Sequence, residues 1–150
     1  MLRSIYRILV LSAIVLPKMQ PTLPPTLTDI EVLADAAWQA IPDRLRRQAK
    51  DVVIRVEDFP DEEICQEMKL ESPFELLGLY QGVAINERSV MDAGGNLDMV
   101  FLYRRPILDY WCESEEELGY LVRHVLIHEI GHHFGLSDAD MEALEREAMT

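Results

Sequence analysis

All four histidines of this 150-residue chain lie between residues 124 and 133, at the end of its most strongly patterned segment. Apolar residues recur at helical spacing through residues 115–134, which predicts a long helix with a broad buried face. Ser114 and Glu117 have the spacing of a capping box at its start. Gly135 is typical of a residue that ends a helix in a left-handed turn. The histidines are therefore expected near the C-terminal end of one helix.

Two of these histidines have the spacing of metal ligands. His128 and His132 are four residues apart, so they extend from one face of the helix and can both reach a zinc ion, at about 2.0–2.1 Å from each nitrogen. Glu129 is rotated by about 100° around the helix axis. It is poorly placed as a third ligand but well placed to take a proton from an attacking water. Gly135 lets the chain turn back, so that Asp138 can supply the third ligand.

Each of these residues also has a plainer interpretation. Asp138 could cap the next helix instead of binding metal, unless Ser137 serves as the cap and leaves the Asp138 carboxylate available. Glu129 could be a solvated helix residue. His124 and His133 are expected to be polar or packing residues. Either histidine could also be the fourth ligand of a closed, structural zinc site.

Composition excludes some partners. The net charge is −13 and the basic residues are scattered, which argues against a nucleic-acid partner. Cys65 and Cys112 do not make a disulfide framework, and we expect both to be reduced packing residues. This cysteine use favours a reducing compartment, so we expect a cytoplasmic protein.

The N-terminal segment, residues 1–27, is set apart from a domain over residues 28–150. It has a basic start and a nine-residue apolar run over 8–16, as in the first two parts of a secretory signal. The run is shorter than the roughly 20 residues that span a bilayer, so no stable membrane span is expected. Alternatively the working protein begins at Met19. A genuine signal would make the protein exported or membrane-associated.

The remaining pattern predicts an α+β domain. We expect a helix over about 30–41, capped by Thr28 or Asp29, and a polar helical piece after Pro42. Strands are expected at 51–60, within 74–86 and at 99–108, and a turn at Gly94 and Gly95. Residues 60–73 read as a loop with a short helical turn, and residues 137–149 as a last helix. Helix, strands and then two helices are typical of a small α+β fold.

The stretch HEIGHHFGLSD resembles the zinc-binding consensus of metzincin peptidases, with aspartate where most have a third histidine. More closely, residues 28–150 resemble a family of small bacterial zincin-like metallopeptidases, through FELLGLYQG, FLYRRPIL and LVRHVLIHEIGHHFGLSDADM. The resemblance implies a minimal zincin core with a small mixed sheet packed on the HExxH helix. It also implies His128, His132 and Asp138 as zinc ligands and Glu129 as the base. The methionine turn of metzincins has no clear counterpart, because Met141 lies in the next predicted helix.

The first functional hypothesis is a zinc-dependent peptidase that binds an extended peptide along an edge strand, at 76–85 or 99–105. The second is a non-catalytic, zinc-stabilised module that binds peptides or a protein partner. A metal-dependent amidase acting on a small substrate would use the same machinery. Nothing in the sequence sets an oligomeric state. Four further side chains could polarise a substrate carbonyl, although structural roles are preferred for them: Tyr80, Tyr103, Arg104 and Arg105.

Overall fold

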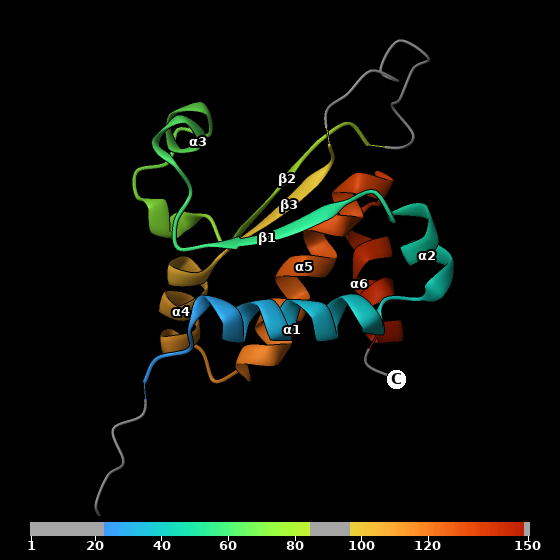
Figure 1. The fold of residues 1–150 in the computed structure, drawn as a ribbon, viewed down its shortest axis with the longest axis horizontal. Helices are drawn as coiled ribbons and strands as arrows, with labels where there is room; N and C mark the ends of the chain where they lie inside the picture. The colour runs from blue at the N-terminus through green and yellow to red at the C-terminus, as the bar shows by residue number, and fades with distance from the viewer. Residues whose placement is uncertain (1–22, 85–96, 149–150) are drawn as a thin grey trace, which may run out of the picture.

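A computed structural model of the chain describes residues 23–84 and 97–148. The apolar N-terminal run, Met19 and the predicted Gly94–Gly95 turn lie outside these ranges. Six helices, a short 3-10 helix and three strands follow one another in the described part (Figure 1). They are α1 (Leu27–Ala40), α2 (Asp43–Gln48), β1 (Val53–Glu57), α3 (Glu62–Glu67), η1 (Pro73–Glu75), β2 (Gly78–Gln81), β3 (Met99–Tyr103), α4 (Arg104–Glu113), α5 (Leu118–Phe134) and α6 (Asp138–Ala148). The predicted α+β class is confirmed.

The strands form a small mixed sheet in the order β1-β3-β2. β1 runs parallel to β3, with Ile54 opposite Val100, and β2 runs antiparallel to β3, with Tyr80 opposite the same Val100. The prediction that a peptide could bind along residues 99–105 was wrong, because β3 is the central strand. Residues 99–103 pair on both sides and cannot accept a further strand, so of the two segments considered for peptide binding, β2 lies at an edge of the sheet.

The core lies where the helices cover the sheet. α5 packs against α1, α4, α6, β2 and β3, so it occupies the centre of the fold (Figure 1). Its apolar residues are buried around most of the helix, which fits its broad predicted stripe. The fully buried side chains include Ile30, Val100, Leu102, Ile107, Val122, Leu126, Ile127 and Ile130. The helix that carries the histidines is therefore a rigid, central element.

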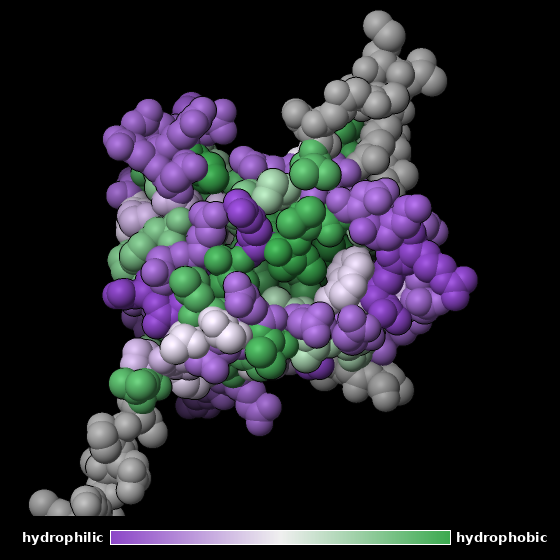
Figure 2. Space-filling model, in the orientation of Figure 1, coloured by the Kyte–Doolittle hydropathy of each residue, from purple (hydrophilic) through white to green (hydrophobic). Residues whose placement is uncertain are grey.

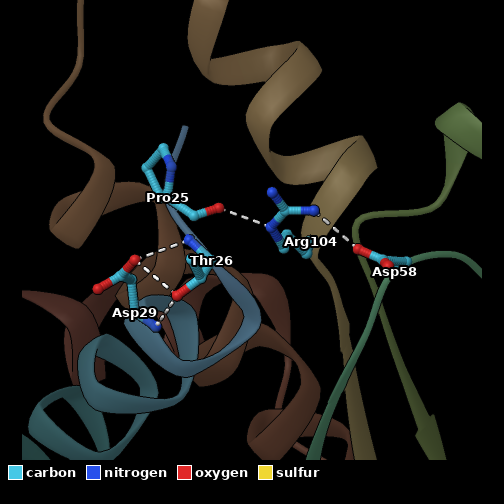
Figure 3. A network of polar contacts seen from close by, with 5 residues as sticks. All are labelled: Pro25, Thr26, Asp29, Asp58 and Arg104. Carbon is cyan, nitrogen blue, oxygen red and sulfur yellow. Dashed lines mark hydrogen bonds and ion pairs between the residues drawn. The ribbon is translucent and has the colours of Figure 1, made fainter. Parts of the chain in front are cut away.

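Helix α1 begins with a capping box formed by Thr26 and Asp29. The Thr26 hydroxyl accepts a hydrogen bond from the Asp29 backbone N–H (3.2 Å), and the Asp29 carboxylate accepts one from the Thr26 backbone N–H (2.7 Å; Figure 3). The hydrogen bonds from Thr26 lower the pKa of Asp29. The predicted cap at Thr28 or Asp29 was wrong, because Asp29 is the reciprocal partner three residues after the cap.

Arg104 joins this end of α1 to the sheet. Its Nε donates to the carbonyl of Pro25 (2.6 Å), and its Nη1 donates to Asp58 just after β1 (2.9 Å; Figure 3). Arg105 lies over the Phe59 ring, 5.6 Å from its centroid. Both arginines thus have structural contacts, as preferred from the sequence.

Two predicted boundaries around α4 were wrong. The third strand ends at Tyr103 rather than at residue 108, and the chain continues directly into α4. Pro106 lies in the first turn of α4, where a missing backbone N–H costs no helical hydrogen bond. Ser114 ends α4 instead of starting the next helix, and α5 begins only at Leu118 with no side-chain cap from Glu117.

Both cysteines are free thiols, as expected. Cys65 is partly buried, but Cys112 is exposed, so its predicted packing role was wrong. Figure 2 shows apolar side chains gathered in a hollow between α1 and β1. A cavity of about 180 Å³ there is lined by Glu31, Ala34, Asp35, Trp38, Ile54 and Val56. Within the described ranges, no helix has the length and apolar character needed to cross a membrane.

Candidate metal centre

Gly135 reverses the chain at the end of α5. Its φ of 64° and ψ of 33° are left-handed, as the sequence predicts. The Gly135 N–H donates to the His132 carbonyl (3.1 Å) and the Leu136 N–H to the Gly131 carbonyl (3.0 Å). This pair of bonds is a Schellman motif, which closes the last turn of the helix. The turn sends the chain back along α5 as α6.

Ser137 is the cap of α6, which leaves the Asp138 carboxylate out of the capping contacts. The Ser137 hydroxyl donates to the Asp140 carboxylate (2.6 Å) and accepts from the Asp140 N–H (3.3 Å). The Ser137 carbonyl accepts from the Met141 N–H (2.9 Å). Asp138 is the first helical residue and its side chain is exposed. The competing capping role considered for Asp138 is therefore taken by Ser137.

Met141 packs α6 against the turn of α5 that carries the two histidines. A Cβ placed on Gly131 would lie 2.3 Å from the Met141 sulfur, so the Met141 side chain would have to shift to admit one. Asp138, Met141 and Glu145 are spaced three and four residues apart, so they lie on one side of α6. Met141 is buried in this contact. As expected, it belongs to the next helix and not to a separate turn.

Glu129 is partly buried and hydrogen-bonded to the sheet. Its Oε2 accepts the backbone N–H of Tyr80 at 2.9 Å. Burial raises the pKa of Glu129, while His132 and the Tyr80 N–H oppose that rise. The alternative of a solvated helix residue is therefore wrong. A carboxylate with a raised pKa is better matched to taking up a proton near neutral pH.

The edge strand β2 lies directly on α5 beside Glu129. Tyr103 N–H donates to the Leu77 carbonyl (2.9 Å), and the alternation of an antiparallel ladder then turns the N–H groups of Gly78 and Tyr80 away from β3. A Cβ on Gly78 would lie 2.6 Å from Cγ1 of Val125 and 3.1 Å from Cγ of Glu129. The missing side chain at Gly78 lets the strand approach the helix this closely.

A polar network behind Glu129 joins three elements. The Tyr80 hydroxyl lies 3.0 Å from Oδ1 of Asp98 and 3.0 Å from Nδ1 of His133. Asp98 and His133 are both buried. His133 points away from His132 and packs in the interior, as its spacing predicts. Neither Asp98 nor the contact of Tyr80 with the helix was predicted from the sequence. The sequence signal for them is their position: Tyr80 lies near the end of β2, and Asp98 directly precedes the neighbouring strand β3.

Three other side chains meet between α5 and α6. One ligand atom from each of His124, His128 and Glu145 lies within 4.8 Å of the other two. This is the group of possible metal ligands that the described residues bring together; His132 and Asp138 lie outside it, and both are exposed. Sequence analysis missed Glu145. Its spacing from Asp138 and Met141 along one side of α6 was the available signal.

Tyr103 is fully buried in the sheet, where its ring stacks on that of Phe101. Burial, with the nearby charge of Glu57, raises the pKa of the Tyr103 hydroxyl. A side chain in this position supports packing, as preferred from the sequence. Among the tyrosines and arginines considered for substrate contact, Tyr80 is the one bonded to Glu129.

The chain matches a known protein family. A family model for zincin-like metallopeptidases matches residues 49–148, two thirds of the chain. The match includes the sheet, the HExxH helix and α6. No curated protein matches the sequence. The chain belongs to the zincin-like metallopeptidase family.

Proposed function

We propose that this protein is a zinc-dependent peptidase in which His128, His132 and Asp138 hold the ion and Glu129 is the general base. The observation that carries the proposal is the environment of Glu129. Its carboxylate is partly buried and bonded to the edge strand, with a raised pKa, on the helix of the two histidines. Family membership supports the same activity class.

The donor set suits zinc. Two imidazoles and a carboxylate are typical of catalytic zinc, which keeps one position open for water. The Schellman turn at Gly135 brings the chain back along α5, and capping by Ser137 leaves the Asp138 carboxylate available. His128 and His132 are one helical turn apart on α5.

When bound, zinc supplies Lewis acidity, which lowers the pKa of an attacking water and polarises a carbonyl. Glu129 accepts the proton of that water at its carboxylate and delivers it to the leaving amine. Until a substrate strand pairs with β2, the Tyr80 N–H fixes the direction of the carboxylate. Because the network of Tyr80, Asp98 and His133 holds β2 on α5, these residues position the base without contacting the reacting atoms.

The peptide would bind as an extra strand along β2. The N–H groups of Gly78 and Tyr80 face away from β3, toward the side on which a new strand would pair. The Tyr80 N–H donates to the Glu129 carboxylate. A substrate carbonyl that took this N–H would release one oxygen of Glu129 to accept a proton. Strand pairing would thus prepare the base.

The test is Glu129→Gln, assayed on a mixed peptide library with product detection by mass spectrometry. Glutamine keeps the shape and can still accept the Tyr80 N–H, so zinc content and fold should persist while hydrolysis falls by about 100-fold or more. Glu142→Gln, an exposed carboxylate on α6, is the control and should leave hydrolysis unchanged. Hydrolysis that persists in Glu129→Gln would remove Glu129 as the base.

One observation favours the non-catalytic alternative. His124 lies next to His128, with ring centroids 4.7 Å apart, where it could add a protein ligand and close the site. A closed site has no exchangeable water and does not bind hydroxamates. Hydroxamate binding to the zinc-loaded protein, measured by calorimetry, would support the peptidase; no binding would support the module.

A further inference from the structure

We propose that His124, His128 and Glu145 form a second position for a divalent ion of the zinc class, between α5 and α6. It lies one helical turn before the position proposed for catalysis. Two imidazoles and one carboxylate are ligands that zinc prefers, and cobalt and manganese accept them as well.

The three side chains are already close enough to share an ion. Their ligand atoms all lie within 4.8 Å of one another, and the His124 and His128 ring centroids are 4.7 Å apart. Ligand atoms around a tetrahedral zinc are about 3.3 Å apart, given bonds of about 2.0 Å. Small side-chain rotations therefore suffice to surround an ion, and neither helix has to move.

The contact between His124 and Glu145 is not a well-formed hydrogen bond. Nδ1 of His124 lies 2.5 Å from Oε1 of Glu145, which is close enough for an ion pair. Both atoms are buried, yet within the described part of the chain neither has a hydrogen bond of acceptable geometry. A buried polar atom left without a hydrogen bond destabilises the fold. A cation between the nitrogen and the oxygen would satisfy both atoms.

The position is both fixed and accessible. Met141 and Leu144 are buried and anchor α6 on α5, so Glu145 is held against its partners. The Glu145 side chain is 15% exposed, whereas that of His124 is 43% exposed. A cavity of about 370 Å³ opens beside His124 and is also lined by Tyr110, Glu116 and Tyr120. An ion can therefore enter from the His124 side past an acidic residue.

His128 belongs to both sets of ligands. The two positions are about 5.4 Å apart along the helix. An ion that takes His128 at the second position withdraws it from His132 and Asp138. This competition rests on the proposed function, whereas the second position itself rests on the contacts of His124, His128 and Glu145.

The test is cobalt binding to metal-free full-length protein, followed by the visible absorption of the ion. A variant with His132→Ala and Asp138→Ala lacks two of the proposed catalytic ligands and should still bind about one cobalt per chain. Adding Glu145→Gln should weaken that binding by about tenfold or more, as loss of a ligand requires. Glu142→Gln, one turn earlier on α6, is the matched control and should change nothing.

Loss of cobalt binding in the His132→Ala, Asp138→Ala variant would overturn the second position. The separate proposal that His128, His132 and Asp138 hold the catalytic ion would still stand. Equal binding with and without Glu145→Gln would also overturn it, since the contact would then be an ion pair. If Glu145→Gln fails to fold by circular dichroism, His124→Gln at the more exposed residue decides in its place. Binding that needs Glu145 but neither His132 nor Asp138 supports the second position.

Discussion

The backbone N–H of Tyr80 donates a 2.9 Å hydrogen bond to Oε2 of Glu129. The same residue reaches α5 a second time, since its hydroxyl lies 3.0 Å from Nδ1 of His133. Main chain and side chain of one edge-strand residue thus fix the strand to the helix that carries the HExxH motif. The orientation of Glu129 depends on how firmly this strand is held.

Removing the Tyr80 hydroxyl should loosen this attachment. Tyr80→Phe takes one hydrogen-bonding partner from each of the buried residues Asp98 and His133. We expect a loss of about 1–3 kcal/mol in the free energy of unfolding, measured with urea. Tyr110→Phe, at a residue that is 50% exposed, is the control and should change it by less than about 0.5 kcal/mol. Equal effects of the two substitutions would show that the network adds no stability.

The raised pKa of Glu129 predicts a pH-dependent stability. Between the ordinary value of 4.5 and the raised value, the folded chain binds more protons than the unfolded chain. The contribution of Glu129 to stability is therefore fully present below pH 4.5 and is lost as pH rises through its folded-state pKa. Glu129→Gln cannot ionise and escapes this loss.

In metal-free protein we therefore expect Glu129→Gln to be more stable than wild type at pH 7, with a difference that shrinks toward pH 4. Urea unfolding in the presence of a chelator measures both values. Glu142→Gln should show no such trend, because its carboxylate is exposed. A Glu129→Gln difference that stays constant with pH would mean that the buried carboxylate does not carry the effect.

The local signals of the site were readable in the sequence. A glycine at 135 that adopts φ of 64°, and a serine at 137 that caps α6, follow from backbone rules that act over a few residues. The residues that reach the site from other elements could not be predicted from such local rules. Tyr80 is 49 residues from Glu129, and no local pattern reports a contact that the sheet creates. Glu145 lies near His124 only because Met141 docks α6 on α5.

The errors near α4 concern the boundaries of elements, where one local pattern fits two structures. The apolar run after residue 99 fits both a strand and a helix, so the predicted strand continued to residue 108, past the first turn of α4 in which Pro106 stands. Ser114 and Glu117 have capping-box spacing, but the chain uses Ser114 to finish α4.

Burial in α5 can be tested with two valines. Val122 of α5 is 0% exposed, whereas Val32 of α1 is 63% exposed. Val122→Ala should lower the free energy of unfolding by about 2 kcal/mol through lost burial and a residual cavity. Val32→Ala should be neutral or slightly stabilising, because alanine is the better helix former. Thermal or urea unfolding of both variants compares them. A similar loss in both would contradict the central position of α5.

The glycines at the two ends of α5, Gly119 and Gly135, should respond to alanine with opposite signs. Gly135 has a left-handed backbone, so Gly135→Ala should cost about 1 kcal/mol. Gly119 lies in the first turn of the same helix, where a Cβ would lie 3.4 Å from Leu33, and Gly119→Ala should gain up to about 1 kcal/mol from helix propensity. Because Gly135 also directs the chain toward Asp138, its variant alone should weaken zinc binding in a chelator competition. A loss of stability without any change in zinc affinity would separate the turn from the metal site and weaken the case for Asp138 as a ligand.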